Sequence, residues 1–252
     1  MSSAVYPSLK GRLVVVTGGG SGIGAGVVEA FARQGARVVF FDIAETDSRA
    51  LEASLADLNP APIFEPCDLM QVEALQAALA KVSAGFGPID VLINNAASDD
   101  RHALTEVTPA YWDDRIAVNL RHLYFAAQAV ATDMRNLGRG VILNLGSISW
   151  HLGLPDLSIY ETAKAGIEGM TRALARELGV DGVRVACIVP GNVRTPRQMK
   201  WYTPEGEAEI VNAQCLKGRI QPSDVAALAM FLASDDARFI TGHEYFVDAG
   251  WR

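Results

Sequence analysis

Residues 14–26 read VVVTGGGSGIGAG. The β-branched run predicts a short buried strand, and the glycine-rich turn that follows predicts the start of a helix. Glycines at positions 18, 22 and 24 allow the backbone to turn tightly, to approach a pyrophosphate and to pack the helix against the strand. The free N–H groups and positive potential at the start of the helix favour phosphate oxygens. The stretch therefore predicts a dinucleotide site.

The next apolar run ends in an acidic residue, Asp42, 18 residues after Gly24. A carboxylate at this place can accept hydrogen bonds from the ribose hydroxyls of adenosine, and its charge would repel a 2′-phosphate. No Lys or Arg stands in the glycine loop or directly after Asp42. These features favour NAD over NADP as the cofactor. The alternative is that Asp42 only caps the end of its strand.

Short runs of Val, Ile and Leu alternate with helical patterns along the chain. Runs that are apolar throughout indicate strands buried on both faces, as in a parallel sheet covered by helices. The predicted strands lie within RLVVVTG, ARVVFFD, PIFEPCDL, IDVLINNAA, GVILNLGS and GVRVACIVPG. The two longest helical patterns span 109–135 and 158–179. We therefore predict an α/β fold with a single doubly wound parallel sheet, a Rossmann fold, and helices on both faces.

One polar stretch, 192–216, interrupts this alternation. Long irregular inserts in compact domains are usually lids or binding loops, so we expect a substrate loop here, with a mobile surface excursion as the alternative. No repeat, linker or low-complexity segment divides the chain. We expect one domain over residues 1–252.

The composition limits the possible function classes. The chain has 252 residues, 50% of them hydrophobic, and a formal net charge of −7. This charge, without any run of Lys or Arg, disfavours nucleic acid and anionic membrane surfaces as partners. No apolar stretch has the length of a signal peptide or a membrane span. The three cysteines and four histidines lack disulfide or metal-ligand spacing, so we expect a cytoplasmic protein without a metal.

A tyrosine and a lysine, Tyr160 and Lys164, share one face of the second long helix, with Cβ atoms about 5–6 Å apart. A free tyrosine has a pKa near 10, and an adjacent ammonium with a positively charged nicotinamide ring would lower it. Ser147 stands at the end of a predicted strand, where ligand sites of such sheets gather. Alone, these residues would more often be surface decoration. With the glycine loop and Asp42 they indicate a base for removing an alcohol proton.

In chain order, these motifs resemble the short-chain dehydrogenase/reductase family over nearly the whole chain. The pattern comprises T-G-x-x-x-G-I-G from Thr17, CDL at 67–69, NNA at 94–96, Asn119, Ser147, Tyr160-x-x-x-Lys164 and PG at 190–191. The resemblance implies Tyr160 as base, Ser147 as the group orienting the substrate, and Lys164 holding the nicotinamide ribose while lowering the tyrosine pKa. It implies that Asn119 supports a water in a proton relay. One departure is Ala97, which stands where the family usually has glycine and could crowd the site by one methyl.

The resemblance also implies which residues bind the cofactor, NAD. They are Gly18, Ser21, Gly22, Ile23, Gly24, Asp42, Asp68, Leu69, Asn95, Ala96, Tyr160, Lys164, Pro190, Gly191, Val193 and Thr195. Members of the family commonly form homotetramers built partly on the two long helices, so we expect this assembly here.

Several stretches, including GSISWHLGL and KWYTPEGEA, are similar to bacterial members of the family that oxidise D-xylose at C1 with NAD. We therefore expect oxidation of an aldopyranose, D-xylose first, to its lactone. Polar groups and aromatic rings suit a sugar, and we expect the substrate to contact Ser98, Ser147, Ser149, Trp150, Tyr160, Asn192 and Arg197. Trp150 and Trp201 could instead be packing residues.

Two other functions are compatible with the sequence. One is an NAD(P)-dependent enzyme of the same family acting on another sugar, a hydroxy acid or a small ketone of the 3-oxoacyl type. A pantetheine site would favour a basic patch, which is not evident in the sequence. The other is a dinucleotide-sensing scaffold without catalysis, against which the intact set of Tyr160 and Lys164 argues.

Overall fold

The β-branched strands form the centre of the molecule, because their alternate residues supply two cores on opposite faces of one sheet. A computed structural model describes residues 4–200 and 202–251 of the chain. Its seven-stranded sheet has the order β3-β2-β1-β4-β5-β6-β7, with all neighbours parallel. The strands are β1 (Leu13–Thr17), β2 (Arg37–Asp42), β3 (Ile63–Pro66), β4 (Val91–Asn94), β5 (Gly140–Leu145), β6 (Val183–Pro190) and β7 (Glu244–Val247). The predicted doubly wound fold is confirmed.

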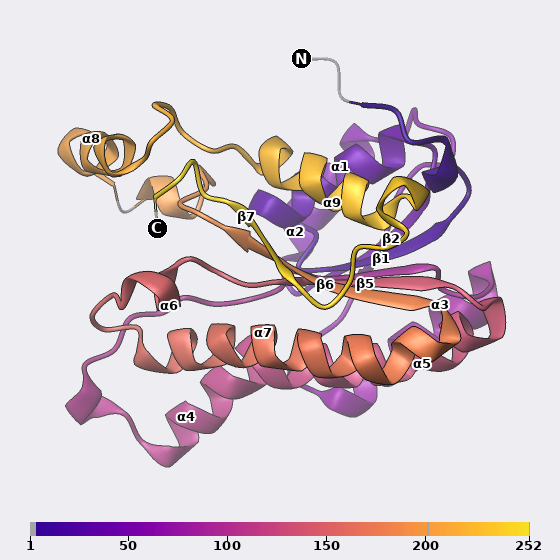
Figure 1. The fold of residues 1–252 in the computed structure, drawn as a ribbon, viewed down its shortest axis with the longest axis horizontal. Coiled ribbons are helices and arrows are strands. Elements are labelled where there is room, and N and C mark those ends of the chain that lie inside the picture. The colour runs from indigo at the N-terminus through magenta and orange to yellow at the C-terminus, as the bar shows by residue number, and fades with distance from the viewer. Residues whose placement is uncertain (1–3, 201, 252) are drawn as a thin grey trace.

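Helices cover both faces of this sheet (Figure 1). On one face lie α1 (Gly22–Arg33), α2 (Glu45–Ser54) and α9 (Pro222–Ala233). On the other lie α3 (Val72–Phe86), α5 (His122–Leu137) and α7 (Ser158–Leu178). The order of the strands reverses between β1 and β4. Ligands of open α/β sheets bind in the crevice at such a switch point.

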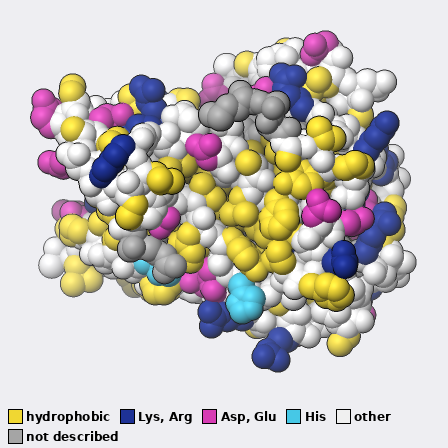
Figure 2. All heavy atoms as spheres, turned by 45° about the horizontal axis from the view of Figure 1, so that its top comes forward, with side chains coloured by type: hydrophobic (Ala, Val, Ile, Leu, Met, Phe, Trp, Pro, Cys, Tyr) yellow, Lys and Arg dark blue, Asp and Glu magenta, His cyan; other side chains and the backbone are white. Residues whose placement is uncertain are grey.

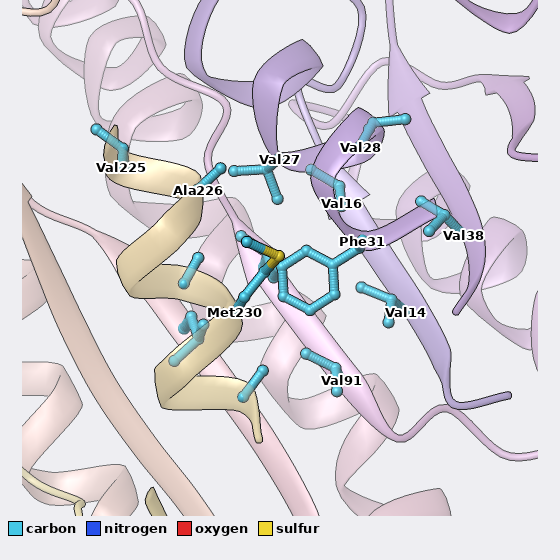
Figure 3. Packing of buried hydrophobic residues seen from close by; sticks show 14 of the residues in the cluster. Val14, Val16, Val27, Val28, Phe31, Val38, Val91, Val225, Ala226 and Met230 are labelled. Carbon is cyan, nitrogen blue, oxygen red and sulfur yellow. The ribbon is translucent and has the colours of Figure 1, made fainter. Parts of the chain in front are cut away.

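The core between α1, α9 and the sheet shows how the first strand anchors its helix (Figure 3). Val14 and Val16 of β1 point into this cluster, where Phe31 of α1 meets Met230 of α9. The intervening Val15 joins the cluster on the opposite face, with the helices α3, α5 and α7. Because alternate side chains of β1 pack on opposite faces, this strand is fixed between both helical layers. The glycine turn follows at its carboxyl end.

Shorter elements surround the carboxyl ends of the strands. The predicted long helix at 109–135 consists of α4 (Pro109–Ile116), a π-helical segment η3 (Ala117–Arg121) and α5. The predicted loop at 192–216 contains a 3₁₀ turn, η5 (Gln198–Lys200), and α8 (Pro204–Ala213). The remaining pieces are α6 (Ser149–Leu152), η1 (Pro7–Leu9), η2 (Leu104–Glu106), η4 (Gly179–Asp181) and η6 (Asp235–Ala237).

The surface carries both signs of charge. On the face that Figure 2 shows, Lys and Arg side chains (dark blue) lie between Asp and Glu side chains (magenta), around a patch of hydrophobic side chains (yellow). Within residues 4–200 and 202–251, no helix is long and apolar enough to cross a membrane. The same residues contain no group of three or more His, Cys, Asp or Glu side chains placed to hold a metal ion.

Candidate active site

A pocket of about 610 Å³ runs along the carboxyl ends of the strands. Its walls come from the segments that directly follow β1 to β6, as expected for a parallel sheet. At one end lie the glycine loop and Asp42, at the other lie Arg197 and Tyr202, and Tyr160 also lines the pocket. One cavity therefore contains the predicted dinucleotide residues and the predicted substrate residues.

Close backbone packing forms the glycine loop. Gly18 has a φ of +63°, and a Cβ at Gly24 would lie 1.9 Å from the carbonyl oxygen of Gly18. Only glycine at position 24 therefore lets α1 approach the end of β1 this closely. Helix α1 begins at Gly22, so its first N–H groups face the pocket next to Ser21. Gly24 itself packs inside the turn rather than lining the pocket.

An asparagine after β4 ties the glycine loop to the sheet. The Asn95 side-chain amide donates to the carbonyl oxygens of Thr17 at 3.0 Å and Gly18 at 2.8 Å. In return, the Thr17 hydroxyl accepts the backbone N–H groups of Asn95 and Ala96. The predicted cofactor residue Asn95 thus lines the pocket, while its side chain fixes the turn that a phosphate would contact.

Asp42 lies at the pocket end of β2, with both carboxylate oxygens already accepting backbone N–H groups. Oδ2 accepts from Gly20 at 2.8 Å and Oδ1 from Ala44 at 2.9 Å. Each oxygen keeps a further lone pair for a ligand hydroxyl. Ile43 beside it is 75% exposed and also lines the pocket, which gives an apolar wall next to an acceptor. This arrangement fits a nucleoside.

The other predicted cofactor residues also line this pocket. They come from the ends of β1, β3, β4 and β6: Ser21, Gly22, Ile23, Asp68, Leu69, Ala96, Pro190, Gly191, Val193 and Thr195. The residues present therefore fit a dinucleotide, with helix N–H groups for the phosphates and acceptors for ribose hydroxyls.

The predicted catalytic group is assembled around a chain of hydroxyls. The Ser149 hydroxyl donates to Ser147 Oγ at 2.9 Å, and Ser147 lies close enough to Tyr160 to lower its pKa. Lys164 Nζ lies 5.3 Å from the centroid of the Tyr160 ring and donates to the carbonyl oxygen of Leu145 at 2.7 Å. The end of β5 and the first turns of α7 thus bring these side chains together in the pocket.

The protein alone does not produce the expected lowering of the tyrosine pKa. Burial raises the pKa of Tyr160 and the charge of Asp99 raises it further, whereas a hydrogen bond from Ser147 and the charge of Arg197 lower it. Burial also lowers the pKa of Lys164 to about 8. Desolvation outweighs the charge pairing that the sequence suggested, because Lys164 is buried and Tyr160 is only partly exposed in the pocket wall.

Asn119 lies behind the pocket and not in its wall. Its Oδ1 accepts the backbone N–H of Ser98 at 2.8 Å, and its amide donates to the carbonyl oxygens of Ser98 and Arg115, both at 3.0 Å. The side chain is fully buried in the π-helical segment η3. These bonds fix the loop after β4.

A buried histidine, His122, lies next to this region and was missed by the sequence analysis. Its Nε2 lies 3.2 Å from the carbonyl oxygen of Ala96, and it is fully buried. Burial and the charge of Lys164 lower the pKa of His122 to about 4, so the ring is neutral at physiological pH. Lys164 therefore provides a positive charge here that His122 does not, and His122 supports the loop after β4.

Ion pairs join the loop after β4 to the segment after β6 at the substrate end. Arg197 lies 2.9 Å from Asp99 Oδ1 and 2.8 Å from Asp100 Oδ1. Gln198 donates to Asp99 Oδ2 at 3.0 Å, and Ser98 accepts from Arg115 at 3.2 Å. The predicted substrate residues Ser98 and Arg197 both line the pocket.

A second set of bonds holds Asn192, another predicted substrate residue. Its amide donates to the Tyr202 hydroxyl, and its oxygen accepts from Arg219 at 2.8 Å. Tyr202 donates in turn to Gln198 at 2.8 Å. The sequence analysis missed Arg115, Tyr202 and Arg219. No local pattern marks them, because their partners lie in other segments.

Trp150 is not placed at the pocket, in contrast to the expectation. Its indole N–H donates to Glu168 Oε1 at 2.9 Å, and its ring lies 3.9 Å from that of His151. The short helix α6 turns successive side chains in different directions, so Ser149 lines the pocket while Trp150 packs against α7. Trp201 lies outside the described residues.

Comparisons with known proteins cover almost the whole chain. The family model described as enoyl-(acyl carrier protein) reductase matches residues 18–252. Among solved structures, a short-chain type dehydrogenase/reductase from Mycobacterium ulcerans has a TM-score of 0.92 and 28% identity, covering 97% of this chain and 90% of that one. The chain belongs to the short-chain dehydrogenase/reductase family.

Named relatives within the family are enzymes. The D-xylose 1-dehydrogenase of Caulobacter vibrioides is 67% identical, with 100% of both chains covered. The "Probable galactose dehydrogenase" of Rhizobium meliloti is 48% identical, covering 99% of this chain and 98% of the relative. The L-fucose dehydrogenase of Mus musculus is 38% identical, covering 98% and 90%. As a dehydrogenase of this family, the protein is an oxidoreductase that acts on CH–OH with a nicotinamide dinucleotide.

Proposed function

We propose that the protein oxidises an aldopyranose at C1, D-xylose first, to the corresponding lactone with NAD as cofactor. The observation that carries this proposal is the grouping of Ser147, Tyr160 and Lys164 in the same pocket as the glycine loop, with Ser149 donating to Ser147. A phenol at the end of a hydroxyl chain can take the proton of an alcohol as it is oxidised.

The residues have distinct roles in this reaction. Tyr160 takes the proton of the C1 hydroxyl, and Ser147 holds the substrate oxygen beside it. Lys164 has two N–H groups left after its bond to Leu145, which suit the hydroxyls of a ribose, and its ammonium favours the phenolate. Bound NAD⁺ supplies the hydride acceptor and a positive ring charge that favours the phenolate as well. Asn119 supports Tyr160 indirectly, by holding the loop after β4.

Sugar identity rests on the relatives and on the polarity of the pocket. Relatives named for D-xylose, galactose and L-fucose match nearly the full chain. The substrate end carries Ser98, Asp99, Asn192, Arg197 and Gln198, which offer both donors and acceptors to a polyol. The 67% identity to a D-xylose enzyme makes D-xylose the first candidate.

NAD is preferred over NADP in this proposal because of Asp42. Its two oxygens stand at the pocket end of β2, held by Gly20 and Ala44. A 2′-phosphate would meet this carboxylate, and no lysine or arginine lies in the glycine loop to offset the repulsion.

The test is a matrix of aldoses and cofactors. Initial rates of NADH formation with D-xylose, L-arabinose, D-galactose, D-glucose and L-fucose should rank D-xylose first by kcat/KM, and NAD⁺ should exceed NADP⁺ by at least about tenfold. Equal use of NADP⁺ would overturn the role of Asp42. Failure with every aldose, but reduction of a 3-oxoacyl thioester, would favour the alternative enzyme of the 3-oxoacyl type.

We also propose a cytoplasmic homotetramer. Trp112 of α4 is 42% exposed and Tyr124 of α5 is 47% exposed, so this helical layer presents large apolar side chains to solvent. The three cysteines are free, in keeping with a reducing compartment. Light scattering at micromolar concentration should give four copies, and a monomer would contradict this assembly.

A further inference from the structure

We propose that Asp99 binds a pair of ring hydroxyls of the sugar and sets the preference of the enzyme for polyhydroxylated substrates. This inference rests on the proposed function and assigns a specificity-determining residue to it.

The position of Asp99 leaves its carboxylate open to the pocket. It lies in the loop after β4 and lines the pocket, whereas its neighbour Asp100 does not. Within residues 4–200 and 202–251, each of its oxygens has one partner, Arg197 near Oδ1 at 2.9 Å and Gln198 donating to Oδ2 at 3.0 Å. A carboxylate oxygen accepts about two hydrogen bonds, so each can take one more. Two adjacent sugar hydroxyls can donate to such a pair of oxygens.

The carboxylate is also held in a fixed orientation. Arg197 and Gln198 both come from the segment after β6, and Tyr202 fixes Gln198 by donating to its Oε1 at 2.8 Å. A side chain locked by such contacts binds a hydroxyl pair with little loss of freedom. Hydrogen bonds to a charged acceptor are also stronger than neutral ones.

Asp99 lies close enough to Tyr160 and Lys164 for its charge to act on both. Its charge raises the pKa of both Tyr160 and Lys164. The effect on Tyr160 opposes formation of the phenolate, so this carboxylate does not assist the base. Binding of sugar hydroxyls gives the Asp99 carboxylate a function despite its unfavourable effect on the Tyr160 phenolate. The same charge would repel an anionic substrate such as a hydroxy acid, which agrees with a neutral sugar.

The test compares two substrates that share the reacting group. D-xylose and tetrahydropyran-2-ol both carry a C1 hydroxyl on a pyranose ring, but the second lacks the three other hydroxyls. Asp99→Asn keeps the shape and removes the charge and one acceptor. We expect KM for D-xylose to rise about 10- to 100-fold, as expected for a hydrogen bond to a charged group, with kcat within about threefold. For tetrahydropyran-2-ol, kcat/KM should not fall, because the variant loses only a charge that opposes the Tyr160 phenolate.

Asp100→Asn is the matched control. Asp100 bonds to the same Arg197 at 2.8 Å but does not line the pocket. If KM rises only because Arg197 loses an ion-pair partner, both variants should show the rise. If it rises because sugar hydroxyls lose an acceptor, only Asp99→Asn should show it. NADH affinity and circular dichroism should be unchanged in both variants.

Inhibition constants provide a measurement that does not depend on turnover of a poor substrate. The compound 1,5-anhydroxylitol keeps the three ring hydroxyls and lacks a hydroxyl at C1, so its inhibition constant should rise about 10- to 100-fold in Asp99→Asn alone. Equal losses for both substrates, or the same selective loss in Asp100→Asn, would overturn the inference while leaving sugar oxidation intact. A wild-type protein inactive on every aldose would instead overturn the proposed function.

Discussion

The two ends of the pocket are held by different kinds of contact. At the cofactor end, Gly24 packs against the carbonyl oxygen of Gly18, and Asn95 donates to that same oxygen. At the substrate end, Arg197 and Gln198 meet Asp99 through side-chain bonds across the mouth of the pocket. The first end is therefore fixed largely by backbone geometry, and the second by pairs of polar side chains.

This difference separates cofactor binding, which the family shares, from the choice of substrate, which differs between its enzymes. Backbone contacts at a strand-to-helix turn suit any dinucleotide, because the phosphates present the same oxygens each time. Polar side chains at the substrate end can change one at a time without disturbing the sheet. The comparison can be tested at Tyr160, at each end of the pocket, and at Lys164.

The largest effect is expected at Tyr160, where the two ends meet. Tyr160→Phe keeps the ring and deletes the ionisable oxygen, so kcat should fall by about 10²–10⁴, the usual contribution of a general acid–base group. NADH affinity, measured by fluorescence titration, should remain within about threefold. A variant that oxidises D-xylose within a few-fold of wild type contradicts the role of Tyr160 as base.

A smaller but clear effect is expected at the cofactor end. Gly24→Ala introduces a methyl 1.9 Å from the Gly18 oxygen, so the loop must move. Overpacking of this kind costs about 1–3 kcal/mol, and NADH affinity should fall about 10- to 100-fold.

Gly85→Ala is the control for this variant. It lies in α3 with nothing within 4 Å of its added methyl, so it should leave affinity unchanged and stabilise the helix by up to about 1 kcal/mol. Unchanged NADH affinity in Gly24→Ala means that the close packing of the turn is not required.

A further effect is expected at Lys164 in the pocket wall, through the pH dependence of protein stability. Its pKa is lowered from 10.5 to about 8, so between these values the unfolded chain binds more protons and stability rises with pH. Burial of the charge costs the fold about 3 kcal/mol below about pH 8. Lys164→Met removes this cost, but it also loses the hydrogen bond to the carbonyl oxygen of Leu145.

Urea denaturation of Lys164→Met and wild type at several pH values measures the effect. The stability of the variant relative to wild type should fall as pH rises from about 8 to 10.5. A difference that does not change with pH would show that Lys164 keeps its ordinary pKa.

The smallest effect on activity is expected at Trp150, which sharpens the boundary of the substrate end. Trp150→Phe removes the donor to Glu168, so the free energy of unfolding should fall by about 1–2 kcal/mol. KM for D-xylose should stay within about twofold because the indole lies outside the pocket. A tenfold rise in KM would place Trp150 against the sugar, as the sequence suggested.

The sequence predicted the cofactor end better than the substrate end for a physical reason. Glycine loop, strand and Asp42 belong to one continuous unit, in which residue type and spacing determine the backbone path. The strands were found because each is a short apolar run. The exception, β7, is a four-residue edge strand, Glu244–Val247, whose side chains are only partly buried.

At the substrate end, the decisive contacts join residues far apart in the chain. Gln198 and Asp99 are 99 positions apart, and Asn192 and Arg219 are 27 apart. Spacing along one helix or strand carries no information about such pairs. Asn119 is a related case: the sequence marks the residue, but only the structure shows that Ser98 and Arg115 occupy its amide.

Isotope transfer from C1 of the sugar tests the central claim most directly. D-xylose carrying deuterium at C1 is incubated with NAD⁺ and the wild-type protein, and the reduced cofactor and the sugar product are analysed by mass spectrometry. Deuterium is expected in the reduced cofactor and xylonolactone as the product, with both formed about 10²–10⁴ times more slowly in Tyr160→Phe. Reduced cofactor without deuterium, or a ketose that keeps the label, would show that oxidation takes place at another carbon and would contradict the account.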